Sequence, residues 1–151
     1  MRRIAIILFS ITILVCIDYF SKQYVEHLFV HSMVNSFSLI GEYLGISLSY
    51  NSGIAFSLPI TGWPLQMLTV MLVFGLSLYY ALREYPKHSQ ILDIWYILIL
   101  AWAFSHMYER IWVGHVIDFI AVKYFAILNF ADIFISIGAC FIFYAYYVRK
   151  Q

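Results

Sequence analysis

Long apolar stretches separated by short polar segments make up most of this chain. Four of them, at about residues 4–20, 64–82, 91–112 and 127–148, reach the roughly 17 to 25 residues that an α-helix needs to cross a bilayer. The pattern therefore predicts four transmembrane helices. Because the number of spans is even, we expect both ends of the chain on the same side of the membrane.

The composition indicates a membrane protein rather than a water-soluble one. Of the 151 residues, 64% are hydrophobic and only 11% are charged, and the mean hydropathy is +0.84. A water-soluble fold could not hide so much apolar side chain. No internal repeat or low-complexity tract divides the chain. We expect residues 1–151 to form a single, all-α integral membrane domain with four transmembrane helices and a small β element at its outer face.

Residues 21–63, the only long polar segment, carry that β element. Residues 46–50 alternate apolar and polar side chains, which is the period of a half-buried strand, and the turn-forming Asn51-Ser52-Gly53 follows. Residues 23–35 show no clean period, so we predict neither helix nor strand there. Between residues 113 and 126 we predict only a short loop, which holds Asp118 close to the last helix.

The basic residues predict the orientation, because Lys and Arg are retained on the cytoplasmic side of a membrane. Six of the nine flank the spans on one side: Arg2, Arg3, Arg83, Lys87, Arg149 and Lys150. We therefore expect both termini to be cytoplasmic. A net charge of +1, with no basic patch elsewhere, argues against a nucleic-acid partner.

Cys16 raises an alternative for the N-terminus. A basic start, an apolar run and the sequence Leu14-Val15-Cys16 look superficially like a bacterial lipoprotein signal. However, Val15 is bulky where a small residue is expected, and three more hydrophobic spans follow, so we favour a retained first helix. Cys16 and Cys140 both fall inside spans, and we expect buried thiols rather than a disulfide.

Two aspartates, Asp118 and Asp132, lie at the predicted outer ends of apolar spans. An ionisable side chain near hydrocarbon costs roughly 2.5 to 3.5 kcal/mol on insertion scales, so it usually persists because it has a function. When two carboxylates come within hydrogen-bond reach, one of them keeps its proton at a raised pKa. The ionised member can then deprotonate a water molecule while the protonated member polarises a carbonyl. This is peptide hydrolysis without a metal or a covalent intermediate.

Further polar residues fall on the same predicted face, in five blocks that run from the first span to the last. They are Asp18 and Lys22 in DYFSK; Asn51, Gly53, Ala55 and Phe56 in NSGIAF; Arg110; Asp118 in VIDF; and Asn129, Ala131 and Asp132 in NFAD. With these blocks in this order, the chain resembles the lipoprotein signal peptidases, which are the type II signal peptidases of bacteria.

The resemblance implies a membrane aspartic protease with Asp118 and Asp132 as its catalytic dyad. The substrate would be a prolipoprotein that already carries a diacylglyceryl group, cut just before the lipidated cysteine, and membrane lipids would surround the enzyme. No cofactor or metal would be needed. The site would lie at the outer, periplasmic face of a bacterial inner membrane. A monomer would suffice, because one chain supplies both aspartates. The other residues would shape or support the site: Asn51, Gly53, Arg110, Asn129, Asp18 and Lys22.

The third span departs from the family pattern. The family has a Gly-rich run followed by Gly-Asn-x-x-Asp-Arg, whereas residues 101–110 read AWAFSHMYER. His106 stands where Asn is expected and Glu109 where Asp is expected. Bulky Trp102 and Phe104 occupy positions where small residues would let helices approach closely. His106 can still donate a hydrogen bond in place of the amide, at the cost of pH sensitivity.

Each candidate residue also has a purely structural interpretation. Asp132 could cap the fourth helix, where free amides and the helix dipole favour a carboxylate. Asp118 could be a solvated loop carboxylate that pairs with Lys123 or Arg110. The remaining alternatives are an i,i+4 ion pair at a helix end for Asp18 with Lys22, and an ordinary turn for residues 51–53.

Two rivals to the peptidase function remain open. The altered third span is compatible with a non-catalytic relative that binds lipidated peptides or serves as a membrane subunit. Intramembrane Asp and His would also suit a transporter, but the charges gather at one face rather than along a path. We expect no metal site, because several histidines show no ligand-like pairing on one helical face: His27, His31, His88 and His115.

Overall fold

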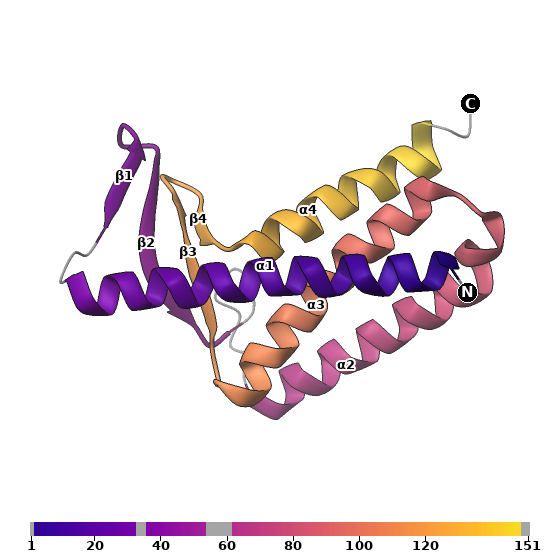
Figure 1. Cartoon of the computed structure of the whole chain (residues 1–151), viewed down its shortest axis with the longest axis horizontal. Coiled ribbons are helices and arrows are strands. Elements are labelled where there is room, and N and C mark those ends of the chain that lie inside the picture. The colour runs from indigo at the N-terminus through magenta and orange to yellow at the C-terminus, as the bar shows by residue number, and fades with distance from the viewer. Residues whose placement is uncertain (1, 33–35, 54–61, 149–151) are drawn as a thin grey trace.

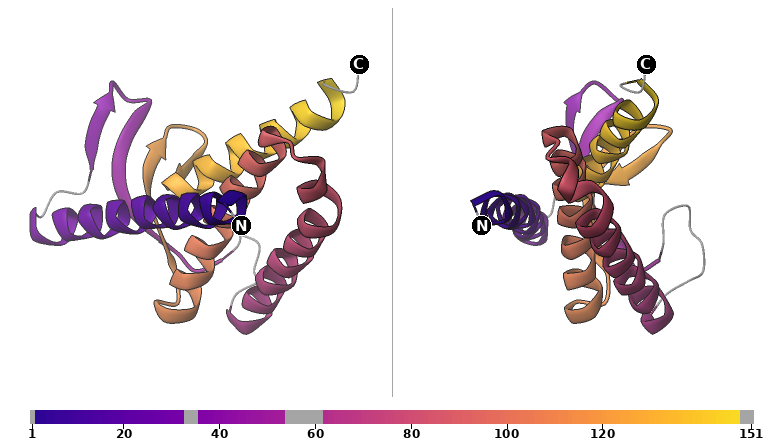
Figure 2. Two further views of the ribbon diagram at one scale, coloured as in Figure 1. Left: turned by 45° about the vertical axis from the view of Figure 1, so that its right-hand side comes forward. Right: turned by 90° about the vertical axis from the view of Figure 1, so that its right-hand side faces the viewer.

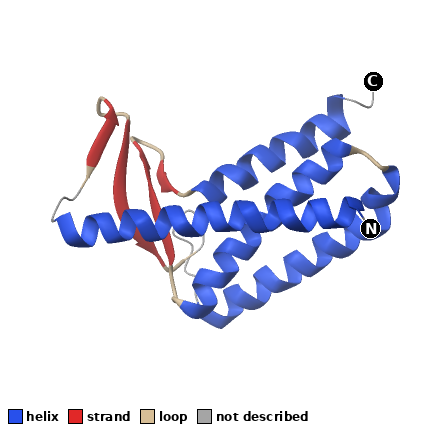
Figure 3. Cartoon of the chain, in the orientation of Figure 1, coloured by secondary structure: helices blue, strands red, loops and turns tan. Residues whose placement is uncertain are grey.

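Within the residues that the structure describes, the chain forms four long helices and one four-stranded sheet (Figure 1, Figure 3). The computed structural model describes residues 2–32, 36–53 and 62–148, except for the side chain of Val148. The sheet lies at one end of the helices, and the beginning of α1 and the end of α4 lie at the opposite end (Figure 1). The start of α1 and the end of α4 therefore lie at the same end of the bundle, and the side of the membrane that they face stays a prediction. Arg149 and Lys150, two of the basic residues used for the orientation, lie outside the described residues.

The predicted spans correspond to α1 (Arg2–Ser32), α2 (Gly62–Tyr79), α3 (Gln90–Trp112) and α4 (Phe130–Phe143). A π-helical turn, η2 (Tyr80–Glu84), and a 3-10 turn, η3 (Tyr85–Lys87), continue α2, and a second π-helical turn, η4 (Tyr144–Val148), continues α4. With these extensions, all four helices are long and apolar enough to cross a membrane. The chain is a multi-pass membrane protein with the fold class that its hydropathy predicts.

The first helix is much longer than predicted. It continues through residues 21–32, so the prediction of neither helix nor strand at residues 23–35 is wrong for residues 23–32, and residues 33–35 lie outside the described residues. Val25 and Phe29, about one turn apart, pack with Phe119 of the sheet in a buried cluster. Contacts with the sheet therefore stabilise this extension, and such contacts outweigh intrinsic propensity. Tyr50 adds a hydrogen bond from its hydroxyl to Glu26, at 2.9 Å.

The sheet is antiparallel with the order β1 (Phe37–Ile40), β2 (Leu44–Asn51), β3 (Val116–Val122), β4 (Ala126–Leu128). The strand predicted at residues 46–50 is confirmed as part of β2. The short loop predicted between residues 113 and 126 is wrong, because β3 pairs with β2 there. Residues 116–119 are buried on both faces of the strand, so they show no alternation that would have revealed it.

The third helix is central to the bundle, since it packs against α1, α2 and α4. In the end-on view, α1 lies on one side of α3 and α2 on the other (Figure 2). Trp95 and Ile99 of α3 meet Ile7 and Ile11 of α1 in the main hydrophobic core. Many large apolar side chains of the helices are exposed on the outside of the bundle, as expected for helices that face lipid. Cys16 and Cys140 are free but exposed, so the prediction that these thiols are buried is wrong.

Candidate active site

Asp118 lies on β3, where the sheet meets the helices. Its backbone is opposite Ser49 of β2, and the residue as a whole is only 5% exposed. The side-chain amide of Asn51 donates a hydrogen bond to Oδ2 at 3.1 Å, and that of Asn129 donates to Oδ1 at 2.6 Å. The carboxylate is therefore held by neutral donors, and it is neither solvated nor part of a loop. Lys123, its possible partner in the structural interpretation, pairs instead with Glu42 at 2.5 Å.

Asp132 lies in the first turn of α4, and its side chain is 26% exposed. Its Oδ2 accepts the backbone N–H of Asn129 at 3.2 Å, which completes a capping box, so the predicted capping role is real. Its Oδ1 accepts the indole N–H of Trp102 at 3.3 Å, and Nε2 of His106 lies 3.5 Å away. Capping uses one oxygen of the carboxylate, and the other is directed to α3.

Asn129 connects the two aspartates. Its side-chain oxygen accepts the backbone N–H of Asp132 at 3.0 Å, while its side-chain nitrogen donates to Asp118. The same nitrogen lies 3.3 Å from the carbonyl oxygen of Ile117, and the residue is fully buried. One side chain thus contacts both carboxylate-bearing residues, and the β3–α4 junction brings them into one site.

The electrostatics of this site raise the pKa of Asp118. Burial raises the pKa of Asp118 from 3.8 to about 6, and the negative charge of Asp132 adds to this effect. The hydrogen bonds from Asn51 and Asn129 oppose the rise without cancelling it. The Asp118 carboxyl therefore titrates close to neutral pH, where a proton can be both held and given up.

Arg110 organises the end of β2. Its guanidinium donates to the carbonyl oxygen of Gly53 at 2.7 Å, and the backbone N–H of Gly53 donates to Oδ1 of Asn51 at 3.1 Å. The positive charge of Arg110 interacts with both Asp118 and Asp132. Arg110 thus joins the predicted site residues of the strand end to the aspartates. Ala55 and Phe56, from the same sequence block, lie outside the described residues.

Asp18, Lys22 and Glu109 form a buried ion cluster that contacts the chain next to the two aspartates. Nζ of Lys22 is 2.6 Å from Asp18 and 2.5 Å from Glu109, and all three residues are nearly inaccessible. The i,i+4 pair is therefore real, but it lies within α1, and its predicted place at a helix end is wrong. Asp18 also accepts the backbone N–H of Ala131 at 2.9 Å, and Glu109 that of Ile117 at 3.3 Å. These bonds reach the residues just before Asp132 and Asp118.

Sequence reasoning missed three contributors on α3. Trp102 donates to Asp132, Ser105 donates to Asp18, and Glu109 completes the ion cluster. Their spacing carried a signal, since polar groups at positions 102, 105 or 106, and 109 recur at the helical period inside an apolar span. Glu109, noted only as a departure from the family pattern, has the reach to contact both Lys22 and the backbone of β3.

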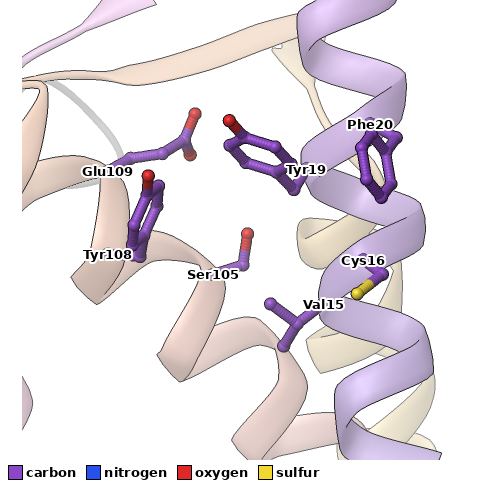
Figure 4. A pocket seen from close by; sticks show the side chains of 7 residues that line it. All are labelled: Val15, Cys16, Tyr19, Phe20, Ser105, Tyr108 and Glu109. Carbon is purple, nitrogen blue, oxygen red and sulfur yellow. The ribbon is translucent and has the colours of Figure 1, made fainter.

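A cavity of about 360 Å³ lies between α1 and α3 (Figure 4). Ser105 and Glu109 of α3 line it together with Tyr19 and Phe20 of α1, and neither Asp118 nor Asp132 is among its lining residues. Figure 4 shows the carboxylate of Glu109 and the hydroxyl of Tyr19 on the same side of this space. The cavity reaches the ion cluster through Glu109.

Comparison with known proteins gives relatives that cover most of the chain. A "Lipoprotein signal peptidase" of Pseudomonas fluorescens (strain Pf-5) is 36% identical over 139 residues, which cover 86% of this chain and 79% of the relative. One of Ectopseudomonas mendocina is 33% identical over 116 residues, which cover 72% of this chain and 69% of the relative.

Solved structures of bacterial membrane enzymes share the fold. One, at 2.3 Å resolution, matches with a TM-score of 0.79 and 23% identity over 94% of this chain and 87% of that one. Another, at 1.9 Å, matches with a TM-score of 0.78 over 94% and 92%. The model of the family described as signal peptidase (SPase) II matches residues 10–148, nearly the whole chain. The chain therefore belongs to the signal peptidase II family.

Proposed function

We propose that this protein is an aspartic endopeptidase of a bacterial cytoplasmic membrane. It removes the signal peptide from prolipoproteins that carry a diacylglyceryl group, and it cuts just before the lipidated cysteine. The observation that carries the proposal is the contact of one side chain, Asn129, with both Asp118 and Asp132 in a chain of the signal peptidase II family. The names of the relatives support the substrate class.

The two aspartates have different surroundings, and these suggest different roles. Asp118 is 5% exposed and its pKa is raised to about 6, which suits the group that holds the shared proton. The side chain of Asp132 is 26% exposed and can meet a water molecule. We assign Asp118 as the general acid and Asp132 as the general base.

In the proposed reaction, Asp132 takes a proton from water as the water oxygen bonds to the scissile carbonyl carbon. Asp118 gives its proton to the carbonyl oxygen, and a neutral tetrahedral diol forms. The diol then returns a proton to Asp118 and the carbon–nitrogen bond breaks. Asp132 gives its proton to the leaving nitrogen, which becomes the free amine of the lipidated cysteine. Both carboxyl groups end the cycle as they began it.

The position of the site fits a substrate that lies in the membrane. The aspartates lie at the sheet end of the bundle, and Arg3, Arg83 and Lys87 lie on elements at the opposite end (Figure 1). By the positive-inside rule, the basic end is cytoplasmic and the aspartates face the outer side. A signal helix and its lipid chains would reach this site laterally from the bilayer.

The test is cleavage of a diacylglyceryl-modified prolipoprotein by the purified protein in detergent or lipid. We expect Asp118→Asn and Asp132→Asn each to lower kcat by at least about 10²- to 10⁴-fold, which is the usual contribution of a positioned acid or base. Asp93→Asn is the matched control, because Asp93 lies near the start of α3 with Arg3 as its partner, and it should cleave normally. Unimpaired cleavage by either dyad variant would refute the proposal.

A non-catalytic relative that binds lipidated peptides is the second candidate, motivated by His106 and Glu109. Both replacements take part in the network around the aspartates, His106 at 3.5 Å from Asp132 and Glu109 through Lys22. The same preparation separates the two candidates. Tight binding of the lipidated peptide by the folded wild type without turnover would favour the binding protein.

A further inference from the structure

His106 is fixed between its own helix and the first turn of α4. Its Nδ1 lies 3.1 Å from the carbonyl oxygen of Trp102, and its Nε2 lies 3.5 Å from Oδ1 of Asp132. The residue is 6% exposed, and its ring packs against that of Trp102 with centroids 5.2 Å apart. Contacts on both ring nitrogens and one ring face hold the imidazole in a single orientation.

These contacts determine which nitrogen carries the hydrogen. A carbonyl oxygen only accepts hydrogen bonds, so the nitrogen that faces Trp102, Nδ1, is the donor. The neutral ring then presents the lone pair of Nε2 to Oδ1 of Asp132. Two facing lone pairs repel each other, whereas a proton on Oδ1 makes the same contact attractive.

We propose that His106 is a positioning residue that stabilises the proton which Asp132 takes from water. The proposal rests on the proposed function, in which Asp132 is the base. As the water O–H bond breaks, its proton bonds to Oδ1 and points at the lone pair of Nε2. The proton later leaves Oδ1 for the departing nitrogen, so the ring forms and breaks no covalent bond. The neutral imidazole thereby makes Asp132 a stronger base than an amide donor at position 106 would.

Charged groups on α1, α3 and β3 surround the contact between His106 and Asp132. Lys22 and Arg110 interact electrostatically with the ring, and the aspartates interact with one another. Among the described residues, the charged groups that act on the ring, on Asp132 or on Arg110 are Lys22 and Asp18 from α1, Glu109 and Arg110 from α3, and Asp118 from β3. Because a substitution at position 106 alters none of these groups, a change in pH dependence reports on the imidazole.

Two substitutions at position 106 test the role through the pH profile of kcat/KM. His106→Gln places an amide nitrogen near the position of Nε2, where it donates to Oδ1 and favours the ionised carboxylate. His106→Asn reaches only the position of Nδ1 and removes the lone pair. For His106→Gln we expect kcat to fall about three- to tenfold and the acid limb to move to lower pH by about one unit. For His106→Asn we expect a smaller move in the same direction.

The control is His88→Asn, at the opposite end of the bundle, where the ring contacts Arg3. It should leave both kcat and the acid limb unchanged. A second readout does not depend on turnover, namely the ring ¹⁵N NMR signals of the five histidines in detergent. We expect His106 to carry hydrogen on Nδ1 and none on Nε2, with the Nε2 signal moved by Asp132→Asn.

The possible outcomes separate this inference from the proposed function. An acid limb at the same pH in the wild type and both position-106 variants, or a hydrogen on Nε2 with none on Nδ1, overturns the role of His106 and leaves the peptidase intact. Absence of cleavage by the folded wild type refutes the proposed function, and the role of His106 fails with it.

Discussion

The two ends of the helix bundle both gather charged side chains, but they compensate the charges differently. At the end that carries the termini, Asp93 accepts two bonds from Arg3, at 2.8 and 2.5 Å, and Glu84 pairs with Lys87 at 2.9 Å. At the sheet end, within the part of the chain that the structure describes, Asp118 accepts bonds from neutral amides and forms no ion pair. Paired carboxylates tie helices together, whereas an uncompensated one costs stability and remains available for proton transfer.

The largest effect should come from Lys22, the buried lysine that pairs with two carboxylates at the sheet end. Lys22→Met leaves the carboxylates of Asp18 and Glu109 buried without their cation, at positions where all three groups are nearly inaccessible. Loss of one partner of a buried pair typically costs about 3 to 5 kcal/mol. We expect the free energy of unfolding in detergent to fall by about this amount, and a loss below about 1 kcal/mol would contradict the assigned role of the cluster.

The next effect concerns the stability cost of Asp118 itself. Because its pKa is about 6 in the folded protein and 3.8 without the fold, folding favours the protonated form. The stabilising contribution is complete below about pH 4 and is lost as the pH rises through 6. Between pH 4 and pH 8 the wild type should therefore lose up to about 3 kcal/mol relative to Asp118→Asn. Thermal unfolding of both proteins across this range measures the difference, and a difference independent of pH would contradict the raised pKa.

Substitutions at Asn129 should have a smaller effect on stability, and they separate its role as a helix cap from its role in cleavage. Asn129→Ala removes the cap of α4 and the bond to Asp118, so we expect a loss of about 1 to 2 kcal/mol in stability and about ten- to a hundredfold in cleavage. Asn129→Ser is the matched variant, because serine caps helices well but is too short to reach Asp118. Serine should restore most of the stability and little of the cleavage rate. Equal recovery of both would mean that Asn129 acts only as a cap.

Hydropathy predicted the helices of this protein better than its sheet. The span predicted at residues 91–112 matches α3 almost to the residue, because crossing a bilayer imposes a length and a composition that are visible in any window. The helical conformation of residues 21–32 and the strand β3 were not predicted. Each is stabilised by contacts with the other, and such contacts leave no pattern in the local sequence. The sheet depends on long-range pairing, and β3, buried on both faces of Val116–Phe119, lacks the alternation that marks a strand.

In the candidate site, too, some features are visible in the sequence and others depend on long-range packing. Short blocks around Asp118 and Asp132 predicted these two residues as the catalytic pair that we propose, because the residue types and their order are specific. The contacts of Trp102 with Asp132 and of Glu109 with Lys22 were not predicted, since they depend on how α3 is rotated against α1 and α4. Helix rotation is set by packing across the bundle, which a linear pattern constrains only loosely.

The smallest effect provides the matched control for Lys22 and sharpens the contrast between the two ends. Lys87→Met removes the same cation from a carboxylate, but the side chain of Lys87 is 50% exposed, whereas that of Lys22 is 1% exposed. Water screens the charge of the half-exposed Lys87, although Glu84 itself is buried, and the substitution leaves in place Tyr146, which donates to Glu84 at 2.5 Å. We therefore expect a loss of at most about 1 kcal/mol and normal cleavage. If Lys87→Met were as damaging as Lys22→Met, the exposure of the lysine would not decide how much a buried carboxylate loses with its cation, and the comparison of the two lysines would be wrong.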